Sequence, residues 1–219
     1  MTTRALVHAA AWWDAEAGPP RAELLPRAER LAASFSTRIL AHVLGGVAER
    51  SPVPLSDVPW VLGSAIGTPG PELRRALVPS RGLALVHAGP ATVAMALVEA
   101  LGRLVEHEVV LVAFVQDVTP PRHEALAAAL LLSRAPAEAR ESRPRSPSEG
   151  PPTGAALVLE APSLRRTSSH SGRPASDHPL LAARALARAV LVGRPTVETV
   201  PCVGVDRPEH WRIELSVAI

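Results

Sequence analysis

Three residues of this chain have side chains that could act in catalysis, two of them as a base with its partner and one as a separate nucleophile. Ser64, His87 and Asp117 each lie where an apolar run ends, which is where we expect a strand to end and a loop to begin. His87 with Asp117 behind it could act as a general base, and Ser64 could be a nucleophile. The stretch from Gly63 to Gly67 does not match G-x-S-x-G, and no helix follows it directly. A structural or interface role for His87 is therefore the simpler interpretation.

Metal, thiol and phosphate chemistry have less support in the sequence. His170, Asp177 and His178 could hold a metal, but they lie in a stretch rich in Ser, Gly and Pro, without tight ligand spacing. The single cysteine, Cys202, excludes an internal disulfide and is best interpreted as a small hydrophobic residue. The glycines of residues 63–70 do not form a phosphate-binding fingerprint. We expect no metal and no cofactor.

Composition sets the broad class of protein. The chain has 219 residues, of which 47% are hydrophobic, enough for a core in one domain spanning residues 1–219. All 23 basic residues are arginines, yet the net charge is only +2, because acidic residues are interspersed with them. Without a clustered basic stripe we expect no nucleic-acid partner. No apolar run is long enough for a membrane span, and no signal peptide is evident, so we expect a cytoplasmic protein.

Short apolar runs alternate with helical periodicity along most of the chain, which predicts an α/β sheet with parallel strand pairs. The expected strands are residues 5–11, 58–62, 83–86, 109–115, 156–160 and 211–217. The expected helices are residues 27–50, 71–77, 90–107 and 179–192. Residues 126–132 fit a helix or a strand, and composition alone favours a helix. Residues 135–154 contain five prolines among Ser, Arg and Glu, which predicts a flexible loop.

Several of these landmarks, taken in order, resemble one protein family. The strand and turn at residues 58–67, the strand, elbow and helix at 85–101, and the strand at 109–115 closing on Gln116 and Asp117 are each similar to ketosynthase landmarks. The tail from Asp177 through residues 211–215 fits as well. The chain resembles the short β-ketoacyl synthase-like proteins called chain length factors, of aryl polyene and related type II systems, over most of residues 5–134 and 177–217.

The resemblance implies an α/β thiolase-like fold, with a mixed sheet and helices on both faces. It makes residues 126–132 a strand, hairpinned with residues 156–160 across the Pro-rich loop. It also makes the strand before the elbow an edge strand that pairs with its two-fold mate. This gives five interface candidates: Leu83, Ala84, Leu85, Val86 and His87. The segment between Gly67 and Arg81 is shorter than expected of the family, in the part that helps to wall the acyl pocket.

The chain lacks the catalytic residues that a condensing enzyme of this family needs. Such an enzyme needs an activated thiolate at the elbow, and the elbow near His87 has no cysteine. The family's two catalytic histidines have no counterpart here. We therefore predict a non-catalytic chain length factor that pairs with a catalytic β-ketoacyl synthase, meets acyl carrier protein only indirectly, and forms a homodimer when alone. The alternatives are a structural homodimeric scaffold of the same fold, or a small hydrolase or acyltransferase that uses Ser64 or His87.

Overall fold

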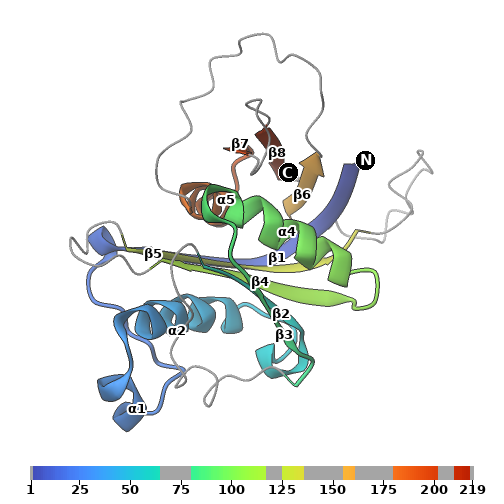
Figure 1. Cartoon of the computed structure of the whole chain (residues 1–219). Coiled ribbons are helices and arrows are strands. Elements are labelled where there is room, and N and C mark those ends of the chain that lie inside the picture. The colour runs from blue at the N-terminus through green and yellow to red at the C-terminus, as the bar shows by residue number, and fades with distance from the viewer. Residues whose placement is uncertain are drawn as a thin grey trace.

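The computed structural model describes residues 2–64, 80–116, 125–135, 155–160, 180–201 and 210–217. Their strands form one eight-stranded mixed sheet in the order β3-β2-β4-β5-β1-β6-β8-β7 (Figure 1). The strands are β1 (Thr2–Asp14), β2 (Trp60–Ser64), β3 (Leu83–Val86), β4 (Val109–Gln116), β5 (Leu126–Arg134), β6 (Ala155–Glu160), β7 (Thr196–Pro201) and β8 (His210–Val217). The helices are α1 (Arg27–Ala32), α2 (Phe35–Ala48), α4 (Thr92–Arg103) and α5 (Leu181–Val192), with short 3-10 turns η1 (Ala15–Ala17), η2 (Leu55–Asp57) and η3 (Gly89–Ala91).

The parallel part of the sheet is small and lies at one end. β2 pairs in parallel with β3 on one side and with β4 on the other, and all other strand pairs are antiparallel. The predicted α/β class with parallel pairs is therefore confirmed. β4 is buried on both faces, as its unbroken apolar run predicted.

Helices cover both faces of this sheet. α2 packs on one face, and α4 and α5 pack on the other (Figure 1). Because strand side chains alternate between faces, β1 contributes Ala9, Ala11 and Trp13 to the core under α2. Its neighbour Ala10 lies in the second core, which α4 and α5 share with β6, β7 and β8.

The single helix predicted over residues 27–50 is wrong: the structure has two helices with a break between them. Ser34 ends the first segment and caps the second, because its side chain accepts a hydrogen bond from the Thr37 N–H at 3.2 Å. The buried stripe survives from Ile39 to Val47, but Leu31, which shares its four-residue spacing, is 82% exposed. The local cap therefore overrides the hydrophobic period.

The predicted hairpin between residues 126–132 and 156–160 is also wrong. Both segments are strands, as the resemblance implied, but β1 lies between them and pairs antiparallel with each. β5 pairs instead with β1 and β4. A long N-terminal strand therefore joins two segments that are neighbours in sequence but not in the sheet.

Smaller differences concern the ends of elements. β2 begins at Trp60 rather than at residue 58 and includes Gly63 and Ser64, which we had placed in a turn. The helix expected to reach residue 107 ends at Arg103. β7 was not predicted. The predicted helix at residues 71–77, the Pro-rich loop, Asp117, His170, Asp177, His178 and Cys202 lie outside the described residues.

No helix in the part of the chain that the structure describes combines the length and the apolarity that crossing a bilayer requires.

Candidate functional site

The carboxyl ends of the three parallel strands meet at one edge of the sheet. Gly63 of β2 is in register with Val86 of β3, and Ser64 is in register with Val115 of β4. Ser64 and Gln116, which end β2 and β4, and His87, which follows β3, are therefore neighbours in space. In open α/β sheets this edge is where ligands bind.

Gly63 of β2 is packed closely against β4 and the start of α4. A Cβ built on it would lie 2.8 Å from Phe114 Cδ1 and 3.1 Å from Thr92 Cγ2. Both neighbours are fully buried, so neither has free space to move into. A glycine at position 63 thus allows the start of α4 to pack directly on the strand ends.

The connection from β3 to α4 is a tight elbow held by one buried hydroxyl. Thr92 Oγ1 accepts a hydrogen bond from the Ala88 N–H at 3.1 Å and donates one to the Gly89 carbonyl at 2.7 Å. Gly89 has a φ of +51°, a conformation that favours glycine. This is the strand-turn-helix geometry that the sequence predicted at this point.

His87 joins the ends of β3 and β2. Its Nδ1 lies 2.7 Å from the Ser64 carbonyl oxygen, and because a carbonyl can only accept, Nδ1 is the donor. The neutral ring then has its free acceptor at Nε2. This bond goes to the backbone of Ser64 and not to its hydroxyl, so it does not form a serine–histidine nucleophile pair. The contact supports a structural role for His87.

Gln116 is a polar side chain that sequence reasoning did not assign to the site. It is 5% exposed, and its Oε1 has no hydrogen-bond partner within the described residues. Buried polar atoms without a partner are rare and deserve a reason. The sequence did contain a signal for this site residue, because Gln116 is a polar residue directly after the apolar run of residues 109–115. Asp117, the proposed partner of His87, lies outside the described residues.

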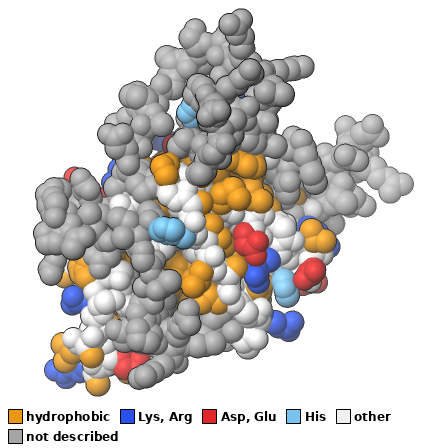
Figure 2. Space-filling view, in the orientation of Figure 1, with side chains coloured by type: hydrophobic (Ala, Val, Ile, Leu, Met, Phe, Trp, Pro, Cys, Tyr) orange, Lys and Arg blue, Asp and Glu red, His pale blue; other side chains and the backbone are white. Residues whose placement is uncertain are grey.

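Among the strands of the described residues, β3 lies at the edge of the sheet, as predicted. Ala84 and Val86 pack against the core under α4, whereas Leu83 and Leu85 are 36% and 44% exposed. The register of β3 with β2 places these two leucines on the sheet face that α2 covers elsewhere. Met95 on α4 is 39% exposed, and Figure 2 shows apolar side chains at the surface over this helix.

Comparisons with known proteins found similar solved structures only: no protein-family model and no curated protein matches the chain. One is a ketosynthase (ApeO) in complex with its chain length factor (ApeC) from Xenorhabdus doucetiae, at 15% identity and a TM-score of 0.49, covering 88% of this chain and 81% of that chain. Another is AbyA1, a tetronic acid condensing enzyme, at 11% identity and a TM-score of 0.44, covering 99% of this chain and 100% of the other.

A third is the 3-oxoacyl-(acyl carrier protein) synthase III FabH from Pseudomonas aeruginosa PAO1, at 12% identity and a TM-score of 0.41. The match covers 61% of this chain and 51% of FabH, so this chain spans about half the length of that protein. Identities of this size do not extend to function. The mixed eight-stranded sheet with helices on both faces fits the α/β, thiolase-like fold that the ketosynthase resemblance implied.

Proposed function

We propose that this chain is a non-catalytic, ketosynthase-like chain length factor that pairs with a catalytic β-ketoacyl synthase in polyene, polyketide or fatty-acid-like biosynthesis. The observation that carries the proposal is an apolar strand, β3, that no other described strand pairs with on its outer side and that comes directly before an elbow that has no thiol. The catalytic partner would hold the nucleophile and dock the acyl carrier protein.

The edge strand supports pairing with another chain. β3 has neither a charged residue nor a proline, which are the usual protections of an unpaired edge. A strand added along β3 would satisfy its outward N–H and C=O groups. Leu83 and Leu85, exposed on one face, would then be partly buried by the side chains of the added strand.

The elbow supports the absence of catalysis. Between β3 and α4 the chain consists of His87, Ala88, Gly89, Pro90 and Ala91. None of them is a thiol, and the imidazole that is present donates to a backbone carbonyl. An acyl chain therefore has no thiolate anchor at this turn.

Association is tested by light scattering on the purified chain at tens of micromolar. The wild type should be a dimer, and Leu85→Arg should be a monomer with an unchanged circular dichroism spectrum, because a charge on an edge opposes strand pairing. Val105→Arg is the matched control, since Val105 is 75% exposed after the end of α4 and should leave the dimer intact. A monomeric wild type, or equal effects of the two arginines, would refute the interface.

The role is tested by co-purification with a full-length ketosynthase encoded beside this chain's gene. We expect a heteromeric complex that Leu85→Arg disrupts and Val105→Arg does not. A homodimer that ignores the synthase would instead favour the structural scaffold. Mass spectrometry after incubation with acylated carrier protein should find no adduct. An acyl adduct that His87→Ala abolishes would favour the acyltransferase and overturn the proposal.

A further inference from the structure

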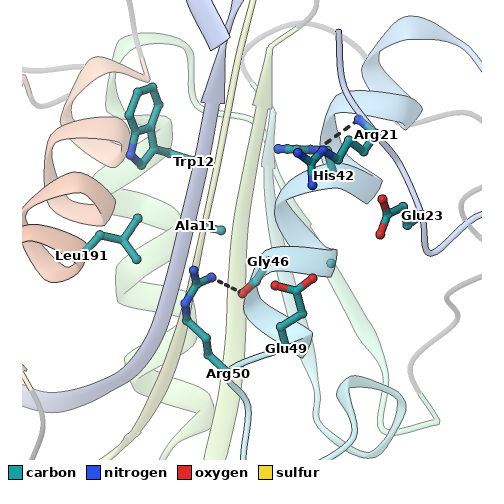
Figure 3. A pocket seen from close by; sticks show the side chains of 10 residues that line it. Ala11, Trp12, Arg21, Glu23, His42, Gly46, Glu49, Arg50 and Leu191 are labelled. Carbon is teal, nitrogen blue, oxygen red and sulfur yellow. Dashed lines mark hydrogen bonds between the residues drawn. The ribbon is translucent and has the colours of Figure 1, made fainter. Parts of the chain in front are cut away.

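A pocket of about 250 Å³ lies where β1, α2 and the end of α5 meet. Residues of these elements and of the segment before α1 line it: Ala11, Trp12, Arg21, Glu23, His42, Gly45, Gly46, Glu49, Arg50 and Leu191. Figure 3 shows Trp12 and Leu191 on the α5 side of β1, and His42 and Glu23 on the α2 side. Pockets for drug-sized ligands measure roughly 300–1,000 Å³, so this one has room for a small molecule only.

Two consecutive glycines of α2 line this pocket. Glycine is unfavourable inside a helix, so a pair of glycines needs a structural reason. At Gly46 the reason is close packing, because a Cβ there would lie 3.0 Å from Ala11 Cβ. Packing does not explain Gly45, whose Cβ would meet only Leu24 Cγ, at an ordinary contact distance of 3.7 Å. A residue without a side chain leaves space where it lines a pocket, and that accounts for Gly45.

Four charged side chains line the pocket, and their charges balance. Arg21 and Arg50 are cationic, whereas Glu23 and Glu49 are anionic. In the part of the chain that the structure describes, no ion pair joins any two of the four, and neither carboxylate has a hydrogen-bond partner. The pocket therefore offers charges of both signs to a ligand.

Two hydrogen-bond donors of this lining are held in place by backbone contacts. Arg50 folds back onto α2 and donates from one guanidinium nitrogen to the Gly46 carbonyl at 2.6 Å, which leaves its other N–H groups for a ligand (Figure 3). His42 Nδ1 accepts a hydrogen bond from the Arg21 N–H at 3.2 Å, so the neutral ring carries its proton on Nε2. Side chains that are already fixed lose little entropy when a ligand binds.

We propose that this pocket binds a free α-amino acid with an apolar side chain. A ligand with a single charge would meet two lining groups of its own sign, whereas a zwitterion pairs with both kinds. The two charges of an α-amino acid are attached to one carbon, and Glu49 and Arg50 are adjacent in the chain. The ligand's carboxylate would pair with Arg50, and its ammonium would pair with Glu49.

The apolar part of the lining accounts for the ligand's side chain. Trp12 is half-buried and Leu191 is 44% exposed, so both have apolar surface left to cover. Covering apolar surface is favourable in proportion to its area, which selects an aliphatic side chain over none. The inference does not rest on the proposed function, because β2, β4 and β5 separate this pocket's strand from β3.

The test is a titration of the full chain with L-leucine, followed by calorimetry and by amide chemical shifts. For so small a ligand we expect a dissociation constant of about 0.1–1 mM. The shifts should map to Trp12, Gly46 and Leu191. Leucine should also raise the melting temperature in a concentration-dependent way, because it binds only the folded chain.

Three analogues test the three parts of the ligand separately. Leucine amide has no carboxylate, 4-methylpentanoate has no ammonium, and glycine has no side chain. Each should bind about tenfold more weakly than leucine or worse. The first analogue also represents the N-terminal residue of a peptide, so it distinguishes a free amino acid from a peptide end.

Two variants with matched controls test the lining. Glu49→Gln should weaken leucine by about tenfold yet leave 4-methylpentanoate unchanged, a difference that a folding defect would not produce. Glu106→Gln, at an exposed glutamate beyond the end of α4, should change neither. Leu191→Glu should weaken leucine, and Leu31→Glu, at an 82% exposed leucine of α1, should not.

The proposal is overturned if leucine gives neither heat nor shifts up to about 10 mM. It is equally overturned if 4-methylpentanoate or leucine amide binds as tightly as leucine, since the pocket would then not recognise a zwitterion. Equal weakening of leucine by Glu49→Gln and Glu106→Gln would place binding elsewhere on the chain.

Discussion

Replacing Gly63 by alanine tests how closely the strand ends and α4 are packed. The new Cβ would lie 2.8 Å and 3.1 Å from two ring carbons of Phe114, and 3.1 Å from the methyl group of Thr92. Carbon atoms in ordinary contact are about 3.5–4.0 Å apart, so the neighbours must retreat by roughly half an ångström. Both are fully buried and the core around them is apolar and close-packed. Overpacking of this kind costs about 1–3 kcal/mol.

Alanine also reduces the entropy of the unfolded chain, which offsets about 0.5–1 kcal/mol of this cost. We therefore expect Gly63→Ala to lower the free energy of unfolding by about 1–2 kcal/mol, and the melting temperature by about 2–8 °C in a chain of this size. The matched control is Gly102→Ala near the end of α4, where a Cβ would meet nothing within 4 Å. It should raise stability slightly. Thermal and urea unfolding of both variants measure this, and a Gly63→Ala protein as stable as Gly102→Ala would refute the packing argument.

Three further changes probe local structure. Ser34→Ala should destabilise by about 1 kcal/mol in urea unfolding, because it removes the cap of α2, and an unchanged midpoint would contradict that cap. Thr92→Val should cost about 1–3 kcal/mol in the same assay, since it leaves the Ala88 N–H without its acceptor while the Gly89 carbonyl keeps the backbone N–H of residue 92, and full stability would show that water or another group replaces the hydroxyl. Burial, and then the positive charge of Arg21, lower the pKa of His42 below its ordinary 6.5, while Glu23 and Glu49 oppose this. The unfolded chain therefore takes up a proton first as the pH falls, so stability should be full above about 6.5 and decline below it, and His42→Gln should lose that part of the pH dependence.

Local sequence patterns predicted those elements whose structure depends on their own residues. The unbroken apolar run of β4 and the short run of β3 gave strands at the expected places. α5 ends at Gly193, which has a φ of +66°, as a glycine after a helix suggests. The break before α2 was missed because the four-residue spacing continues through it. Only the competing cap at Ser34 distinguishes two helices from one.

Pairing between distant segments could not be predicted from local patterns. Nothing in residues 126–134 or 155–160 indicates that β1 lies between them, because each pairs equally well with any long apolar strand. β7 was missed because its six residues include two threonines and a glutamate and follow a helix stop closely. The resemblance to ketosynthases corrected the helix that composition favoured for β5, yet gave it the wrong partner.

The residues of the candidate site also fall into two groups, those that local sequence patterns could place and those whose roles depend on distant parts of the chain. His87 was placed correctly at the end of β3, and Ser64 near the end of β2, because strand ends follow apolar runs. The roles of Thr92 and Gln116 depend on which atoms lie nearby in space. In the sequence Thr92 is an ordinary helix residue, and only the structure shows that its hydroxyl bridges two backbone groups of the elbow. Gln116 becomes a candidate site residue only because the structure shows that its polar side chain is buried.

The elbow and the β3 edge form one mechanical unit, and this bears on how the chain meets a partner. Thr92 fixes the turn, His87 ties the end of β3 to the end of β2, and Gly63 lets α4 pack against both. In a condensing enzyme such rigidity would position a nucleophile, but here the turn has no thiol to position. The same contacts still fix the backbone of a four-residue strand whose outer side pairs with no strand of the part of the chain that the structure describes. An isolated edge this short would lose much binding free energy on being ordered, whereas a strand already held at its end loses little. For the pairing proposed above, the elbow would hold the edge in place, and a change that loosens the elbow should weaken association even though it touches no partner.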